Sequence, residues 1–116
     1  FYASVLETSN IFYQSLNESR ATNVRLFYMI SMCWNTPQLL KGVAEVNKIS
    51  AGTELNERFW LIQMAKAVAF TVLWYRSVEL NEKTQYLDSA RLMLRQAQLV
   101  PGFAEQTHNE LTQDYL

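Results

Sequence analysis

Glu54-Leu-Asn-Glu-Arg-Phe-Trp-Leu-Ile-Gln-Met-Ala-Lys-Ala-Val-Ala-Phe-Thr-Val-Leu-Trp-Tyr-Arg-Ser-Val-Glu79 is the stretch of sequence that decides the fold of this chain. Its centre, from Ala67 to Tyr75, is apolar on every side of a helix apart from Thr71. Because a helix that is apolar all round must be covered all round, the stretch predicts a central helix over about residues 54–79. The other segments have narrower apolar stripes and would pack around this helix.

The composition indicates one globular, helical domain. The chain has 116 residues, of which 49% are apolar and 18% are charged, so it can bury a sizeable core and is not disordered. Three glycines and two prolines are few, which favours long regular elements over turn-rich β structure. We therefore expect an all-α, single-domain bundle of five or six helices over residues 1–116. Because the first residue is Phe1 and not Met, we expect a processed or excised part of a longer chain.

Two helices are expected before the first proline. Residues 1–18 place apolar side chains near one face at helical spacing, and residues 23–34 form an almost unbroken apolar run. The length of that run does not separate a helix from a buried strand, but its Met and Leu content and its lack of flanking Gly favour a helix. Ser19 or Thr22 is expected to cap it.

A third helix is expected from residue 37 to about residue 48. Thr36 suits the N-cap position, and Pro37 suits the first helical position, where the backbone N–H needs no partner. The apolar side chains expected to face inward are Leu39, Leu40, Val43, Ala44 and Val46.

Thr53 is expected to cap the central helix, and Glu54 and Glu57 would place negative charge in its first turn, where the helix dipole favours it. Glu54 and Arg58 are spaced as an i,i+4 pair on a solvated helix face.

Lys66 is the charged residue inside the most apolar part of this helix. With Gln63 and Asn56 it is expected to share a narrow polar edge, so that its ammonium reaches water. The alternative interpretation, a buried lysine that acts as a base or nucleophile, has no companion motif in the sequence.

A further helix is expected after the central one, from about Leu80 until Pro101-Gly102 stops it. Its apolar stripe at helical spacing consists of Tyr86, Leu87, Ala90, Met93, Leu94 and Ala97. A last short helix is expected from Phe103 to about Asp114.

Residues 74–105 resemble a helical hairpin of the tetratricopeptide (TPR) family. The family's helix pairs carry Trp, then Ala, a bulky residue, Ala and Pro at set intervals, and the matching residues are Trp74, Ala90, Leu94, Ala97 and Pro101. Val78 stands where the family prefers Gly, the last interval is one residue short, and the pattern does not recur about 34 residues upstream. The resemblance implies a hairpin that binds peptides or proteins.

Nucleic acid is not an expected partner. The formal net charge of −1 provides no basic footprint for phosphate contacts. Residues 43–53 are similar to a helix-turn-helix of bacterial regulators, but the following helix opens with Glu54 and Glu57. A recognition helix needs polar side chains facing the groove and positive charge near the phosphates.

The sequence contains no catalytic, metal-binding or cofactor signature that we recognise. Cys33 and His108 are the sole cysteine and histidine, so one chain cannot assemble an ordinary zinc site or an internal disulfide. Cys33 lies in an apolar run and is expected to be an inert buried thiol. No Gly-rich phosphate loop is present.

The most apolar window, residues 59–75, includes Lys66 and is shorter than the roughly 20 apolar residues that a membrane span needs.

These observations favour a non-enzymatic protein–protein interaction module. Its role would be that of an adaptor, a chaperone-like protein, a regulator or a self-associating domain. Aromatic residues make up 13% of the chain, and the candidate interface is Tyr2, Phe12 and Tyr13. A terminal helix has few neighbours, so it cannot easily shelter all three rings from a protein partner or a second copy of the chain. The alternative is a ligand-sensing helical domain with an apolar pocket between helices for a small molecule. A cytoplasmic location is slightly favoured.

Overall fold

The computed structural model describes residues 18–108, with side chains from residue 22 onward. Its helices are α2 (Glu18–Asn35), α3 (Leu39–Asn47), α4 (Glu57–Arg76) and α5 (Leu80–Ala97), and residues 104–108 are helical again. No strand occurs in this part of the chain. The protein is therefore an all-α helical bundle, as the sequence predicts.

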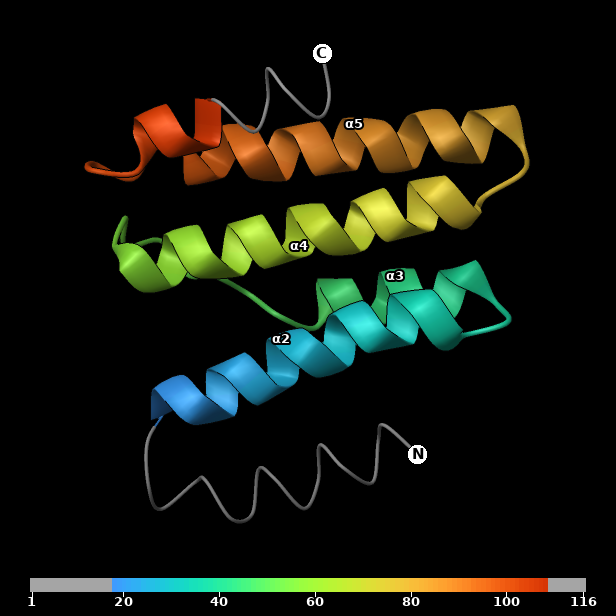
Figure 1. Cartoon of the computed structure of the whole chain (residues 1–116), viewed down its shortest axis with the longest axis horizontal. Helices are drawn as coiled ribbons and strands as arrows, with labels where there is room; N and C mark the ends of the chain where they lie inside the picture. The colour runs from blue at the N-terminus through green and yellow to red at the C-terminus, as the bar shows by residue number, and fades with distance from the viewer. Residues whose placement is uncertain (1–17, 109–116) are drawn as a thin grey trace.

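The four helices form two antiparallel pairs that lie side by side. α2 and α4 run in the same direction, whereas α3 and α5 run back in the opposite direction (Figure 1). α4 packs against α2, α3 and α5, so it is the central helix that its apolar sequence predicts. It spans Glu57–Arg76 and is shorter at both ends than the predicted residues 54–79.

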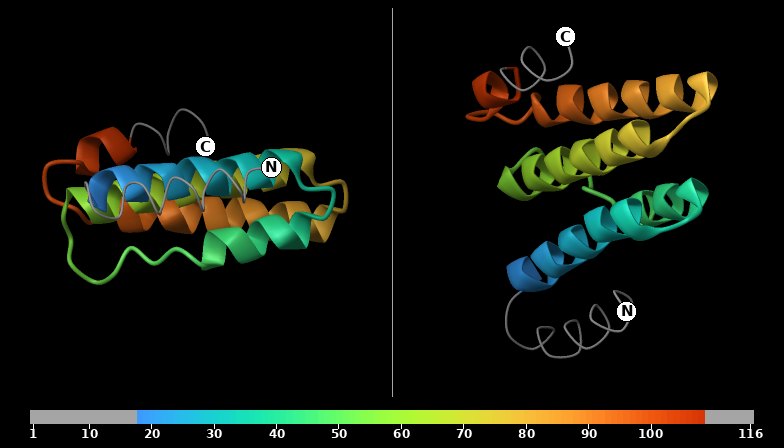
Figure 2. Two further views of the ribbon diagram at one scale, coloured as in Figure 1. Left: turned by 90° about the horizontal axis from the view of Figure 1, so that it is seen from below. Right: turned by 45° about the vertical axis from the view of Figure 1, so that its right-hand side comes forward.

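The prediction that α4 is covered all round is wrong. Leu61, Val68 and Tyr75 are 38%, 44% and 68% exposed, and they lie on one face of the helix. In Figure 2, α4 lies between α2 and α5, which cover two of its sides, and the exposure of these three side chains shows that the described helices do not cover the remaining face.

The core lies where the other three helices meet α4. Leu73 and Ile62 of α4 have no exposed surface, and α2, α3 and α5 each contribute side chains that are equally buried. Those contributions are Met29, Cys33, Val46 and Ala90. Burial of large apolar side chains stabilises a fold by about 1.5–3 kcal/mol each, so this cluster is the main source of stability.

Gly42 allows α3 to approach α2 and α4 closely. A Cβ atom at this position would lie 2.9 Å from Leu73 Cδ2 and 3.3 Å from Cys33 Sγ. The Cys33 thiol lies 3.8 Å from the Gly42 carbonyl oxygen, to which it donates a weak hydrogen bond. Because the interior is close-packed, a larger side chain here would displace one of these neighbours.

Cys33 is expected to react with a thiol reagent only when the protein unfolds. Its side chain has no exposed surface, and burial raises the pKa of the thiol to about 12, so little thiolate forms at neutral pH. Ellman's reagent at about pH 8 should label no thiol in the native protein and one per chain in denaturant. Rapid labelling of the native protein would contradict this burial.

The structure corrects the predicted start of the central helix. Asn56 and not Thr53 is the N-cap of α4, because the Asn56 side chain accepts a hydrogen bond of 3.0 Å from the backbone N–H of Phe59. Glu54 therefore precedes the helix, and the helical i,i+4 pair between Glu54 and Arg58 is not formed. Glu57 remains in the first turn, as predicted.

The predicted ends of the earlier helices also need correction. α2 already includes Glu18, so Ser19 and Thr22 lie within this helix and not before its start. α3 begins at Leu39, and the Thr36 hydroxyl accepts a hydrogen bond from the N–H of Gln38 just outside it. Of the five side chains expected to face inward from this helix, the two that are exposed are Leu40 and Ala44.

The apolar stripe predicted for α5 is confirmed, since its members are buried or half-buried against α4. After α5 the chain turns at Gly102, which has a positive φ of 90°, and returns to the start of α4. There Trp60 stacks on Phe103 with ring centroids 4.6 Å apart, and its indole N–H donates a 2.8 Å hydrogen bond to the Thr107 hydroxyl. These contacts hold residues 104–108 against α4.

Candidate functional site

The candidate interface predicted from the sequence consists of Tyr2, Phe12 and Tyr13, which lie outside the residues that the structure describes. Their role stays a prediction. The described part of the chain contains a different exposed apolar surface, on α2 and α4.

This surface, called the apolar stripe below, consists of Phe27, Trp34, Leu61, Val68 and Tyr75. Phe27 and Trp34 of α2 are 74% and 50% exposed, and they stand one heptad apart. The three members on α4 are also spaced by heptads. Residues at this spacing lie on one face of a helix, so each helix presents a continuous apolar row.

Arg76 holds the two rows in register. Its guanidinium donates one hydrogen bond of 2.6 Å to the carbonyl oxygen of Cys33 and another of 2.6 Å to that of Thr36, at the end of α2. Next to this clamp the Trp34 and Tyr75 rings meet edge to face, with centroids 6.0 Å apart and an interplanar angle of 63°. Phe27 and Val68 stand one heptad before Trp34 and Tyr75, on two helices that run in the same direction.

The apolar stripe carries no charge. The sequence between Phe27 and Trp34 has no charged residue, and between Leu61 and Tyr75 the charged residue is Lys66, which projects from the opposite side of α4. Exposed apolar side chains are ordinary when scattered singly, but rows of them at heptad spacing on two neighbouring helices are typical of a binding surface. The sequence analysis expected Val68 and Tyr75 to be covered by neighbouring helices, although the heptad spacing of the five residues was a readable signal.

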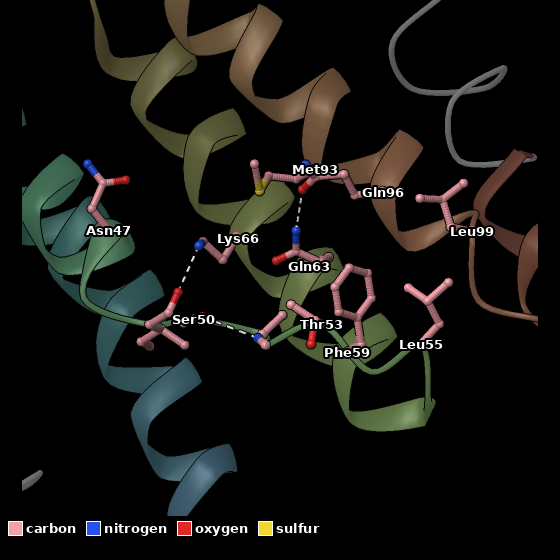
Figure 3. A pocket seen from close by; sticks show the side chains of 13 residues that line it. Asn47, Ser50, Thr53, Leu55, Phe59, Gln63, Lys66, Met93, Gln96 and Leu99 are labelled. Carbon is pink, nitrogen blue, oxygen red and sulfur yellow. Dashed lines mark hydrogen bonds between the residues drawn. The ribbon is translucent and has the colours of Figure 1, made fainter.

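A separate depression of about 540 Å³ lies on another side of α4, between the start of that helix, the end of α5 and the connection from α3 to α4. Phe59, Gln63 and Lys66 project into it from α4, and residues 49–53 form one wall (Figure 3). Met93, Gln96 and Leu99 form the opposite wall. Its volume is within the range of small-molecule sites, about 300–1,000 Å³.

Gln63 is buried and does not lie on the predicted solvated edge, whereas Lys66 is partly exposed. The Lys66 ammonium donates a 2.7 Å hydrogen bond to the carbonyl oxygen of Ile49, and its partial burial lowers the pKa of the group. Gln63 is 5% exposed and donates a hydrogen bond to the side-chain oxygen of Gln96. The prediction is therefore wrong for Gln63, because Gln96 of α5 covers its side chain.

The structure does not bring together a nucleophile and a base from Cys33 and His108. Cys33 is enclosed in the core, whereas His108 is exposed at the end of the described chain. Within residues 18–108, no group of three or more His, Cys, Asp and Glu side chains gathers in a way that could hold a metal ion. None of the helices described has the length and apolar character that crossing a membrane requires.

Comparison with known proteins adds no assignment: no protein-family model, curated protein or solved structure matches the chain. The resemblance of residues 74–105 to a TPR hairpin is neither supported nor contradicted by these comparisons and stays a prediction.

Proposed function

We propose that this protein is a non-enzymatic protein–protein interaction module, of adaptor, regulatory or chaperone-like type, that binds an amphipathic helix of a partner along the apolar stripe. The observation that carries the proposal is the row of exposed apolar side chains at heptad spacing on two parallel helices. An amphipathic helix with apolar residues at matching intervals would lie along these two rows and cover them.

The dimensions of the apolar stripe indicate the length of the bound segment. Leu61 and Tyr75 are two heptads apart on α4, which corresponds to about 21 Å along a helix. A partner helix of about 15 residues would cover that distance. Because the apolar stripe has no charge, the partner helix should place apolar residues against it and keep its charged residues at the edges of the interface.

The paired helices also support a binding role. α4 and α5 form an antiparallel hairpin that contains Trp74, Ala90 and Ala97, three of the residues on which the TPR resemblance rests. A TPR-like hairpin would be a scaffold that presents helix faces to peptides. The apolar stripe, on the outer faces of α2 and α4, is the specific surface on which we expect such a peptide to bind.

Phe27→Glu should weaken binding of helical peptides strongly, because it places a charge in the apolar stripe. The matched control is Leu40→Glu, since Leu40 is 76% exposed and Phe27 is 74% exposed, but Leu40 lies on α3 outside the apolar stripe. Peptides of about 15 residues would be selected from a display library with the wild type, and their affinities measured by fluorescence anisotropy. We expect Phe27→Glu to weaken binding at least tenfold, or about 1.4 kcal/mol, and Leu40→Glu to leave it unchanged.

Circular dichroism of both variants would show that each remains folded. Equal affinities of Phe27→Glu and the wild type would contradict the proposal, as would selected peptides without apolar residues at helical spacing. Sedimentation velocity of the wild type would measure its oligomeric state independently. A dimer that Phe27→Glu dissociates and Leu40→Glu does not would replace the partner helix with a second copy of this chain.

A further inference from the structure

The depression beside α4 has the features of a built binding site. It combines an open cavity of about 540 Å³ with a partly buried cation, a buried amide and an apolar wall. These features come from three separate parts of the chain, namely the connection between α3 and α4, the first half of α4 and the end of α5 (Figure 3). The apolar stripe lies on a different face of α4, so the two surfaces can be tested independently.

The cation is Lys66. None of the residues that line the depression is acidic, so no carboxylate there neutralises the ammonium. An ammonium has three N–H donors, and one of them is used by the carbonyl oxygen of Ile49. An anion that enters the depression would meet a positive charge that is partly removed from water, where charge-assisted hydrogen bonds are strongest.

The amide is that of Gln63, one helical turn before Lys66. The residue is 5% exposed, and no described group donates a hydrogen bond to its side-chain oxygen. A buried polar atom that lacks a partner is costly, so a ligand that satisfied it would gain affinity.

The apolar wall completes the site. Phe59 forms its floor and is 8% exposed, while Leu55 and Leu99 stand at the rim and are 45% and 61% exposed. In Figure 3 both leucines are drawn on the other side of Phe59 from Lys66. A ligand body resting there would cover apolar surface at a distance from the charged group.

We propose that this depression binds a small carboxylate that has a hydrogen-bond donor next to the carboxylate and an apolar body, the chemistry of an N-acyl amino acid. The carboxylate accepts hydrogen bonds from the Lys66 ammonium. The neighbouring amide N–H donates to the Gln63 side-chain oxygen after a small side-chain movement. The acyl chain packs over Phe59 and between the leucines at the rim.

Three related probes separate these contributions by isothermal titration calorimetry. N-octanoylglycine has the carboxylate and the N–H, N-octanoylsarcosine lacks the N–H, and N-octanoylglycinamide lacks the charge. We expect N-octanoylglycine to bind with a Kd of about 1 mM or lower, and each of the other two to bind at least about fivefold more weakly. No binding of N-octanoylglycine, or equal binding of the uncharged amide, would overturn the proposal.

Matched variants locate the site. Lys66→Met and Gln63→Met should each weaken binding of N-octanoylglycine about fivefold to tenfold. Their controls are Lys41→Met and Gln85→Met, which change the same residue types at exposed positions outside the depression. Phe27→Glu on the apolar stripe should also leave binding unchanged. Loss of affinity in the controls but not in Lys66→Met would overturn the assignment.

Nuclear magnetic resonance of the wild type provides a reading that does not depend on whether a variant folds. Titration of the ¹⁵N-labelled protein with N-octanoylglycine should shift the side-chain amide signals of Gln63 and Gln96 and the backbone signals of residues 49–53. Shifts confined to other parts of the protein would show that the probe binds elsewhere, and the proposed site would be wrong.

Discussion

Leu73→Ala is expected to lower the free energy of unfolding by about 2–5 kcal/mol, the largest effect of any single truncation considered for this protein. Leu73 has no exposed surface, and it lies in the core cluster that joins α4 to α2 and α3. The Gly42 backbone packs against it so closely that neighbouring atoms cannot easily move into the space left by the truncation. A cavity would remain, and its cost adds to the loss of apolar burial.

Urea unfolding followed by circular dichroism would measure this change, with Leu40→Ala as the control. Leu40 is 76% exposed on α3, so the same truncation there should change stability by less than about 0.5 kcal/mol. A loss of under about 1 kcal/mol for Leu73→Ala would show that α4 is not packed as described.

Arg76→Met is expected to lower the free energy of unfolding by about 2–3 kcal/mol. The substitution keeps an apolar side chain of similar length but removes both hydrogen bonds to the carbonyl oxygens of Cys33 and Thr36. Those carbonyls stand at the C-terminal end of α2, where the helix dipole also favours a positive charge. Arg76→Lys keeps the charge and loses the fork that reaches both oxygens, so its effect should be intermediate.

The control for this series is Arg58→Met, an exposed arginine in the first turn of the same helix. We expect that change to alter stability by less than about 0.5 kcal/mol. If chemical denaturation shows the same small effect for Arg76→Met, the clamp between α2 and α4 does not contribute to stability, and the register of the apolar stripe rests on side-chain packing alone.

The sequence predicts the long helices well because their apolar periodicity is strong. α5 matches its predicted stripe, and α4 is the central helix that its composition requires. The predicted ends are less accurate because several polar residues near each end can act as caps. Thr53 and Asn56 both have the chemistry of an N-cap, and only the path of the connection from α3 selects Asn56.

The candidate surfaces were harder to predict, for two physical reasons. An apolar helix has the same sequence whether its neighbours surround it or lie only along its flanks. The sequence therefore predicts that Val68 and Tyr75 are buried in the core. The depression depends on contacts between distant segments: Lys66 contacts Ile49, and Gln63 contacts Gln96. Sequence patterns indicate which residues share a face of one helix, but they do not show which loop covers that face.

The side-by-side packing of the helices has a consequence for the order of folding. α4 and α5 are joined by a short turn and pack along their length, so this hairpin can form while few residues are fixed, at a low entropic cost. Docking of α2 through the Arg76 clamp joins residues separated by 43 and 40 positions, and the Trp60–Thr107 hydrogen bond spans 47. These long loop closures gain contacts only when α4 is already in place. The helix that forms the centre of the bundle is thus also the template on which the distant segments assemble.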